Sequence, residues 1–285
     1  MTAESARVAR VSVRVVRTRT SVCISILIIV DGKRLEGWLM FRPIYEPRTR
    51  AKEYSDLAIN IYDGCNHGCW YCYAKKMHDR WHPKDDFADV SPREGIVEAV
   101  QRQLARGKYK GNKIMLCFTC DPYPALIDTM PTREVIMAIK NAGANVQILT
   151  KGGNRARRDF DLLGAGDSFG ITLSCLSDDI AKINEPLAAL PNERIGTLQT
   201  ISKRVNTWVS FEPVIEPDWV LQLIEHLPKV VSGGTLLKIG KLNHYKNDTD
   251  WKAFGLEAEQ ICKEKGWNYY IKEDLRAEML GGSLT

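Results

Sequence analysis

Three cysteines stand close together in the run DGCNHGCWYCYA, which covers residues 63–74. Cys65, Cys69 and Cys72 have the spacing C-x3-C-x2-C, and Tyr71 directly precedes the last of them. Three thiolates on one short loop can ligate three irons of a cubane iron–sulfur cluster, whose usual number of cysteine ligands is four. The pattern therefore predicts a 4Fe-4S cluster with one iron left open to a ligand that is not protein.

A structural zinc site is the alternative reading of the same loop. His67, His78 or His82 would then supply the fourth ligand, because structural zinc takes four Cys or His ligands. Zinc sites usually contain two ligand pairs separated by a linker, and no second pair follows here at such a distance. We therefore favour the cluster, and keep a non-enzymatic, zinc-stabilised binding module as an alternative.

Length and composition indicate a globular enzyme-sized domain. The chain has 285 residues, of which 44% are hydrophobic and 26% are charged, as is ordinary for a soluble protein. The cysteines outside the motif are scattered and lack the dense spacing of a secreted disulfide scaffold. An oxygen-sensitive cluster fits a reducing compartment, so we expect a cytoplasmic protein.

The excess of positive charge is confined to the beginning of the chain. Residues 1–50 contain ten Lys/Arg against four Asp/Glu, whereas the remainder contains 30 against 31. The apolar run 22–30 is too short to span a bilayer, which needs about 20 residues, and no cleavage site for a signal peptidase follows it. We expect no membrane association. Residues 1–40 are read as a basic leader, either an added strand or a poorly ordered extension from an upstream start codon, before a domain at 41–285.

Short apolar strands alternate with amphipathic helices after this leader, a pattern typical of a parallel sheet wrapped by helices. Helical stripes include Val135, Ile136 and Ile139, with Gly143 and Gly266 as the ends of two helices. The expected strands are 57–62, 113–118, 145–150, 169–174, 206–211 and 235–239. Six such units predict an α/β fold, a partial (β/α)6 TIM-like barrel of parallel strands with outer helices.

Chemistry in a β/α barrel lies at the carboxyl ends of the strands. Polar or ionisable residues recur there along this sequence, which suits a ligand held from several strands at once. They are Cys120 and Asp121 after the second strand, Lys151 after the third, Ser174 at the fourth, and Ser210 and Glu212 at the fifth.

The cysteine motif with its preceding aromatic residue resembles that of the radical S-adenosylmethionine (SAM) superfamily. Together with the runs TCDPY at 119–123 and ILTK at 148–151, it resembles the spore photoproduct lyase branch, which includes proteins described as DNA repair photolyase-like. The similarity covers about residues 45–275. It implies that the open iron chelates the amino and carboxylate groups of SAM, and that an electron from the cluster releases a 5′-deoxyadenosyl radical.

The resemblance also implies roles for individual residues. Tyr71 would lie beside the adenine, Lys151 would pair with the cofactor carboxylate, and Ser174 and Ser210 would help to hold the cofactor. Asp121 is either a ligand of the ribose or substrate, or a turn residue before a proline.

Three further residues are candidates for the substrate side. Glu212 would bind a polar substrate, or else form a salt bridge with Lys238 or Lys241. Spore photoproduct lyase uses a cysteine near the end of the second strand as a hydrogen-atom donor. Cys117 and Cys120 stand in that region here, and packing in the core is the alternative role for Cys117.

The substrate class stays open between two kinds of radical SAM enzyme. The lyase resemblance favours a nucleic acid base or nucleotide, whereas the near-neutral charge of the main domain favours a peptide or a small metabolite. We expect a flavodoxin or ferredoxin as electron donor, and a monomeric protein.

Overall fold

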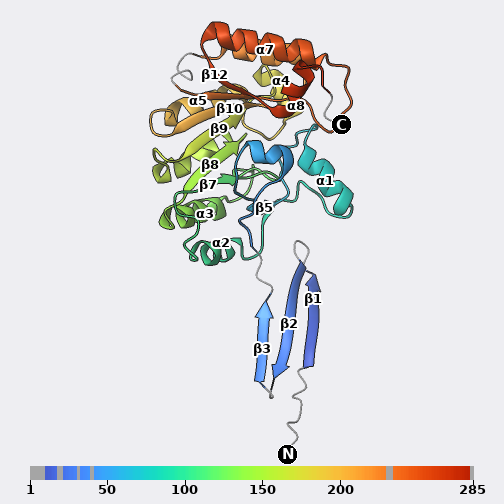
Figure 1. Cartoon of the computed structure of the whole chain (residues 1–285), viewed down its shortest axis with the longest axis vertical. Coiled ribbons are helices and arrows are strands. Elements are labelled where there is room, and N and C mark those ends of the chain that lie inside the picture. Colours follow the sequence, from blue (N-terminus) through green and yellow to red (C-terminus); the bar gives the residue numbers. More distant parts are fainter. Residues whose placement is uncertain (1–9, 18–21, 31–32, 39–41, 229–233, 283–285) are drawn as a thin grey trace, which may run out of the picture.

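A parallel seven-stranded sheet is the frame of the computed structural model (Figure 1). The structure describes the backbone of residues 10–17, 22–30, 33–38, 42–228 and 234–282, and side chains only from residue 42 onward. The strand order is β12-β11-β10-β9-β8-β7-β4. These strands are β4 (Ala58–Ile59), β7 (Lys113–Leu116), β8 (Asn145–Thr150), β9 (Ser168–Thr172), β10 (Asn206–Phe211), β11 (Leu236–Ile239) and β12 (Asn268–Ile271).

The predicted fold class is confirmed, and all six expected strands are present within a few residues of their expected bounds. The structure adds one strand, β12, which pairs in parallel with β11 at the edge of the sheet. Its sequence NYYI is short, and only Ile271 is buried, so it lacks the continuous apolar run by which the other strands were predicted.

Helices α1 to α7 lie between strands of this sheet along the chain, and α8 follows its last strand (Figure 1). Val135, Ile136 and Ile139 are fully buried, and Gly143 and Gly266 have positive φ at helix ends, as predicted. The α-helices are α1 (Tyr73–Trp81), α2 (Ile96–Leu104), α3 (Met130–Asn141), α4 (Asp178–Asn184), α5 (Pro191–Ile201), α6 (Pro217–His226), α7 (Trp251–Lys265) and α8 (Glu273–Met279). The remaining elements are the 3-10 helices η1 (Thr49–Glu53) and η2 (Gly153–Leu162) and the two-stranded sheet β5 (Tyr62–Asp63) with β6 (Ser91–Pro92).

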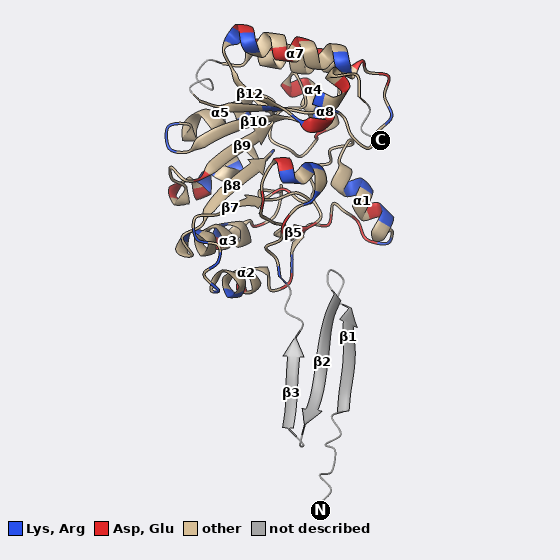
Figure 2. Ribbon diagram, viewed as in Figure 1, with Lys and Arg blue, Asp and Glu red and all other residues tan. Residues whose placement is uncertain are grey.

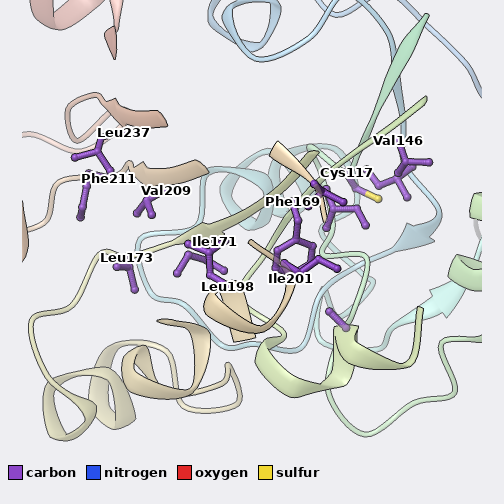
Figure 3. Close-up of a cluster of buried hydrophobic side chains, with 14 of the residues drawn as sticks. Cys117, Val146, Phe169, Ile171, Leu173, Leu198, Ile201, Val209, Phe211 and Leu237 are labelled. Atoms are coloured by element: carbon purple, nitrogen blue, oxygen red, sulfur yellow. The ribbon is translucent and has the colours of Figure 1, made fainter. Parts of the chain in front are cut away.

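The main core lies between the sheet and these helices (Figure 3). Phe169 and Ile171 of β9 are fully buried in one cluster with Leu198 and Ile201 of α5. Side chains alternate along a strand, so these two residues share a face while Gly170 belongs to the other. Burying each such side chain contributes about 1.5–3 kcal/mol, and this packing fixes where the strand ends lie.

The opposite face of the sheet is filled by a smaller cluster. Met115 and Trp208 are buried there together with Ala58, and Tyr54 packs against them. Gly170 leaves the room for this indole, because a Cβ at that position would lie 2.2 Å from a ring carbon of Trp208. The segment that carries Tyr54 therefore covers part of this face of the sheet.

The chain before residue 40 forms a separate antiparallel sheet. Its strands are β1 (Arg10–Arg17), β2 (Val22–Val30) and β3 (Lys33–Trp38), and β2 pairs with both others. None of the described strands of this sheet pairs with the seven-stranded sheet. The apolar run at 22–30 is strand β2, and no helix within the described residues is long and apolar enough to cross a membrane.

Candidate functional site

The three motif cysteines lie on the loop that joins β5 to α1. Cys72 caps the helix, since its Sγ accepts a hydrogen bond from the Lys75 amide at 3.4 Å. The amide of Cys65 donates a hydrogen bond to the Phe87 carbonyl at 2.8 Å, which holds the start of the loop against the segment that follows α1. Gly68 has a φ of +72°, and a Cβ there would lie 2.8 Å from Pro186, so this turn needs glycine.

The chemistry of the loop fits a cluster ligated by thiolates. All three cysteines are free, Cys69 is buried, and the other two are partly buried. Burial raises the pKa of the Cys65 thiol well above its usual value and that of Cys69 to about 12, so bare thiolates are disfavoured there. Binding to iron supplies the positive charge that stabilises a buried thiolate. Within the described residues, no three Cys, His, Asp or Glu side chains stand close enough together to hold a single metal ion.

A buried charged network lies beside the loop. The Lys151 Nζ atom, directly after β8, is 5.2 Å from the centre of the Tyr71 ring and 4.0 Å from Glu185 Oε1. The Tyr71 hydroxyl donates to Glu185, and Arg194 forms an ion pair with the same carboxylate. The side chains of Glu185 and Arg194 are both fully buried. The residue expected at the adenine and the residue expected at the carboxylate of the cofactor are thus joined through Glu185.

Asp121 has its carboxylate occupied by neighbouring protein groups. One oxygen accepts from the Tyr123 amide at 2.8 Å and from the Thr150 hydroxyl at 2.6 Å. The other accepts from the backbone amide of Lys151 at 2.9 Å. Asp121 therefore joins the ends of β7 and β8 and fixes the backbone from which the Lys151 side chain starts.

His67, a candidate zinc ligand, is buried between two charged groups. Its Nδ1 lies 3.6 Å from Asp121 Oδ2, and its Nε2 lies 3.0 Å from an Arg155 nitrogen. Burial lowers the pKa of His67 to about 4, so the ring is neutral at pH 7. His78 and His82 instead stack on each other along α1, with ring centres 5.3 Å apart.

The two candidate serines lie in different surroundings. Ser174, just beyond β9, is fully buried, and its hydroxyl has no hydrogen-bond partner among the described residues. An orphaned buried hydroxyl is costly, and a bound ligand would satisfy it. The Ser210 hydroxyl instead lies 3.1 Å from that of Tyr54. The structure thus groups Ser210 with Glu212, at the other half of the sheet.

Glu212 is the centre of a second polar network. It accepts hydrogen bonds from Tyr54 at 2.5 Å, from Lys272 at 2.7 Å and from Asn243 at 3.3 Å. The alternative prediction of a salt bridge with Lys238 or Lys241 is therefore wrong as to the partner, because Lys272, after the unpredicted strand β12, supplies the ion pair.

The other two lysines are occupied elsewhere. Lys241 pairs with Glu278 at 2.5 Å. The ammonium of Lys238 donates to the Glu53 carbonyl at 2.9 Å and lies 4.6 Å from the Tyr54 ring centre and 5.3 Å from that of Trp208.

Cys117 and Cys120 follow β7, which pairs with β8 on the side of the sheet away from β10 to β12. Cys117 is buried in the main core, and Cys120 is partly buried against it. Burial and the neighbouring thiol of Cys120 raise the pKa of Cys117 well above its usual value. Tyr73 donates its hydroxyl proton to the Phe118 carbonyl, so α1 contacts the same strand end.

Comparison with known proteins identifies the family. Residues 59–227, more than half of the chain, match the model of the radical SAM superfamily. The chain belongs to the radical SAM superfamily. This enzyme family implies a 4Fe-4S cluster and SAM as cofactors, and a reductant to supply the electron.

The curated relatives are themselves without an assigned function. An uncharacterized protein of Methanocaldococcus jannaschii is 27% identical over 63% of this chain, and one of Acidianus two-tailed virus is 29% identical over 60%. The matched regions cover 66% and 60% of those proteins, so this radical SAM chain spans less than two thirds of their length.

Two solved structures have a similar fold. Spore photoproduct lyase complexed with dinucleoside spore photoproduct has a TM-score of 0.60 at 12% identity, over 80% of this chain and 79% of that one. Streptococcus suis SuiB bound to S-adenosylmethionine has a TM-score of 0.56 at 10% identity, over 80% of this chain and 53% of that one. At these identities the likeness establishes the fold alone.

Sequence reasoning missed Glu185 and Arg194. Neither follows a strand, since Glu185 ends α4 and Arg194 lies in α5, so a search of strand ends passes over them. The available signal was two opposite charges, nine positions apart, on either side of the run PLAALPNE at 186–193.

Proposed function

We propose that this radical SAM enzyme cleaves SAM reductively and starts radical chemistry on a nucleic acid base or nucleotide. The observation that carries the proposal is the contact between the cysteine loop and the Lys151 network. Tyr71, inside the loop, lies under the Lys151 ammonium and bonds to Glu185. The thiols that would ligate a cluster and the Lys151 ammonium that would bind the carboxylate of SAM thus belong to one connected group of residues.

The cofactor side is assigned to the half of the sheet around β8 and β9. Cys65, Cys69 and Cys72 would hold the cluster, which supplies the electron that breaks a carbon–sulfur bond of SAM. Lys151 would bind the carboxylate of SAM through a charge-assisted hydrogen bond. Tyr71 would pack beside the adenine.

Two further residues support this cofactor site in different ways. Ser174 would donate a hydrogen bond to the cofactor from its hydroxyl, which has no partner among the described residues. Asp121 would act mainly by fixing the Lys151 backbone.

The substrate side is assigned to the half around β10 to β12. Glu212 and Ser210 lie there with Tyr54 and Lys272, where donors and acceptors of both charges could bind a polar base. Cys117 and Cys120 follow β7, next to β8 in the sheet, and a thiol there would serve as hydrogen-atom donor.

A nucleic acid substrate is supported by the fold shared with spore photoproduct lyase, which was solved with a dinucleoside spore photoproduct. A peptide or small metabolite is the second candidate, because residues 51–285 have a net charge near zero. A flavodoxin or ferredoxin is proposed as the reductant.

The first test is anaerobic reconstitution with iron and sulfide, followed by measurement of 5′-deoxyadenosine in the presence of dithionite. We expect the wild-type protein to bind iron and form the product, and Cys69→Ala to lose both, because only three thiolates are available. Cys262→Ala on α7 is the matched control with a buried free cysteine, and should retain both. A colourless protein that retains zinc would contradict the proposal.

A further inference from the structure

Helix α1 presents an unusual amount of apolar surface to solvent. Of its nine residues only Ala74 is buried. Trp81 is 71% exposed, Met77 46% and Tyr73 38%. Single exposed apolar residues are common, but three large ones within nine residues of one helix indicate a surface that another molecule covers.

Two cations share this face of the helix. Residues three and four apart are neighbours on a helix, so Lys76 and Arg80 lie beside Tyr73, Met77 and Trp81, and these five residues are called the α1 face. The Arg80 guanidinium lies 5.5 Å from the centre of the Trp81 ring. Asp79 is the one carboxylate of the helix, and helical geometry places it about 120° around the axis from the centre of the α1 face. It is paired with Lys75 at 2.6 Å. The α1 face is therefore positive and aromatic.

Aromatic side chains continue this face toward the cysteine loop. Tyr73 stacks on His244, with ring centres 6.1 Å apart and an angle of 27°. The Lys76 ammonium lies 4.7 Å from the centre of the Tyr245 ring, and that ring meets Trp70 at 5.4 Å. Within the described part of the chain, every large aromatic side chain that is exposed, Trp70, Tyr73 and Trp81, belongs to this region. Figure 2 shows α1 at the side of the molecule, with its basic segments in blue and its acidic segment in red.

We propose that the α1 face binds a single strand of nucleic acid, which carries the substrate base to the site; this rests on the proposed function. Cations that contact phosphates and aromatic rings on which bases stack are the combination by which proteins hold single strands. A duplex keeps its bases stacked inside, so the exposed rings of Trp81 and Tyr73 favour unpaired bases. The strand would run from Trp81 to Tyr73, next to the cluster ligand Cys72.

The direction of the strand is limited by charge at the far end of the helix. Asp85 and Asp86 follow α1 and are exposed, so they would repel phosphates beyond Trp81. At the near end, Tyr73 contacts the Phe118 carbonyl beyond β7, close to Cys117 and Cys120. A base that leaves the Tyr73 end would therefore approach the end of β7, where Cys117 and Cys120 lie.

The test is fluorescence anisotropy of a labelled oligodeoxynucleotide of about 12 bases of mixed sequence, with the reconstituted full-length protein. This length lies within the range of about 4–16 nucleotides that single-strand-binding folds occupy. We expect Arg80→Ala/Trp81→Ala to weaken binding on the order of 10- to 100-fold. The slope of log affinity against log salt should fall by about 0.7, as for one lost phosphate contact. Lys252→Ala/Leu256→Ala, which removes an exposed cation and an exposed apolar residue from α7, is the matched control and should bind as wild type.

Each alternative occupant gives a different result. Wild-type protein that binds no single strand at low salt, or that binds a duplex of the same sequence more tightly, would overturn the proposal. So would unchanged binding in Arg80→Ala/Trp81→Ala combined with slower cluster reduction by flavodoxin, which would assign the face to the electron donor. 5′-deoxyadenosine formation with dithionite, measured in the same preparations, tests the proposed function separately, because neither pair of substitutions touches the cofactor residues.

Discussion

Lys151 is the residue through which the cofactor assignment can be tested without disturbing the cysteines. Its backbone is fixed by Asp121, and its ammonium lies over Tyr71 near Glu185. We expect Lys151→Ala to weaken SAM binding on the order of 10- to 100-fold while iron content is unchanged, because a charge-assisted hydrogen bond contributes about 1.5–3 kcal/mol.

The measurement is anaerobic titration of SAM, with iron content as the control for cluster assembly. Lys151→Arg should not restore full affinity, since a planar guanidinium does not replace a compact ammonium between Tyr71 and Glu185. Unchanged affinity in Lys151→Ala would show that the ammonium does not face the cofactor.

The lowered pKa of Lys238 can be tested through the free energy of unfolding, without any measurement of activity. It is only 8% exposed, and burial, followed by repulsion from Lys272, lowers its pKa from 10.5 to about 8. Between these two values the unfolded chain binds more protons than the folded one, so the contribution of Lys238 to the free energy of unfolding increases as pH rises. The gain is at most about 3 kcal/mol by the linkage of pKa to stability.

We therefore expect the wild type to gain stability relative to Lys238→Met when the pH is raised from about 7.5 to about 9.5. Urea unfolding of the cluster-free protein at both values gives the difference, in which the titration of other groups cancels. Lys252→Met, at an exposed lysine of α7, is the matched control. A constant difference between wild type and Lys238→Met would contradict the lowered pKa.

At the scale of the elements, the contrast between β9 and β12 shows what could be predicted. β9 is buried along its whole length and was predicted at 169–174, so its position and the placement of Ser174 near its end followed from the sequence. β12 is a short edge strand that lacks such a run. Because it was not predicted, the Lys272 that follows it could not be named as the partner of Glu212.

The close contact of β9 with β10 leads to a prediction at the same scale. Gly170→Ala would place a Cβ 2.2 Å from the Trp208 ring, so the indole or the strand must move. Overpacking of this kind costs typically about 1–3 kcal/mol, and we expect a loss of that size in the free energy of unfolding.

The measurement is urea denaturation, with Gly196→Ala as the matched control. Gly196 lies inside α5 with open space around its would-be Cβ, so alanine there should stabilise the protein by about 0.5–1 kcal/mol. If Gly170→Ala is as stable as wild type, Trp208 does not pack on β9 as the structure has it.

At the scale of the whole molecule, the cysteine loop is held by parts of the chain far apart in sequence. Asn66 exchanges two hydrogen bonds with the backbone of Ala125, and the Leu187 amide donates to the His67 carbonyl at 3.1 Å. The loop therefore depends on the segment that follows β7 and on the connection between α4 and α5. Such long-range contacts have no local sequence pattern, which is why the motif predicted the ligands but not the surroundings that hold them.

No described strand pairing links the three-stranded sheet before residue 40 to the seven-stranded sheet. The first pairing to the seven-stranded sheet is the antiparallel bridge between Tyr45 and Ala58. The site residues all lie after it. We expect deletion of residues 1–40 to leave SAM cleavage nearly intact, with iron content and 5′-deoxyadenosine formation close to those of the full-length protein.

A deletion that extends to residue 46 is the matched control, because it also removes Tyr45 and the buried Ile44. The backbone of Ile44 exchanges hydrogen bonds with the Gln103 side chain at 2.8 and 2.9 Å. The longer deletion should therefore lower the midpoint of thermal unfolding, whereas the shorter one should not. If the shorter deletion alone abolishes folding or SAM cleavage, then β1 to β3 are an integral part of the enzyme domain, and its boundary near residue 41 is wrong.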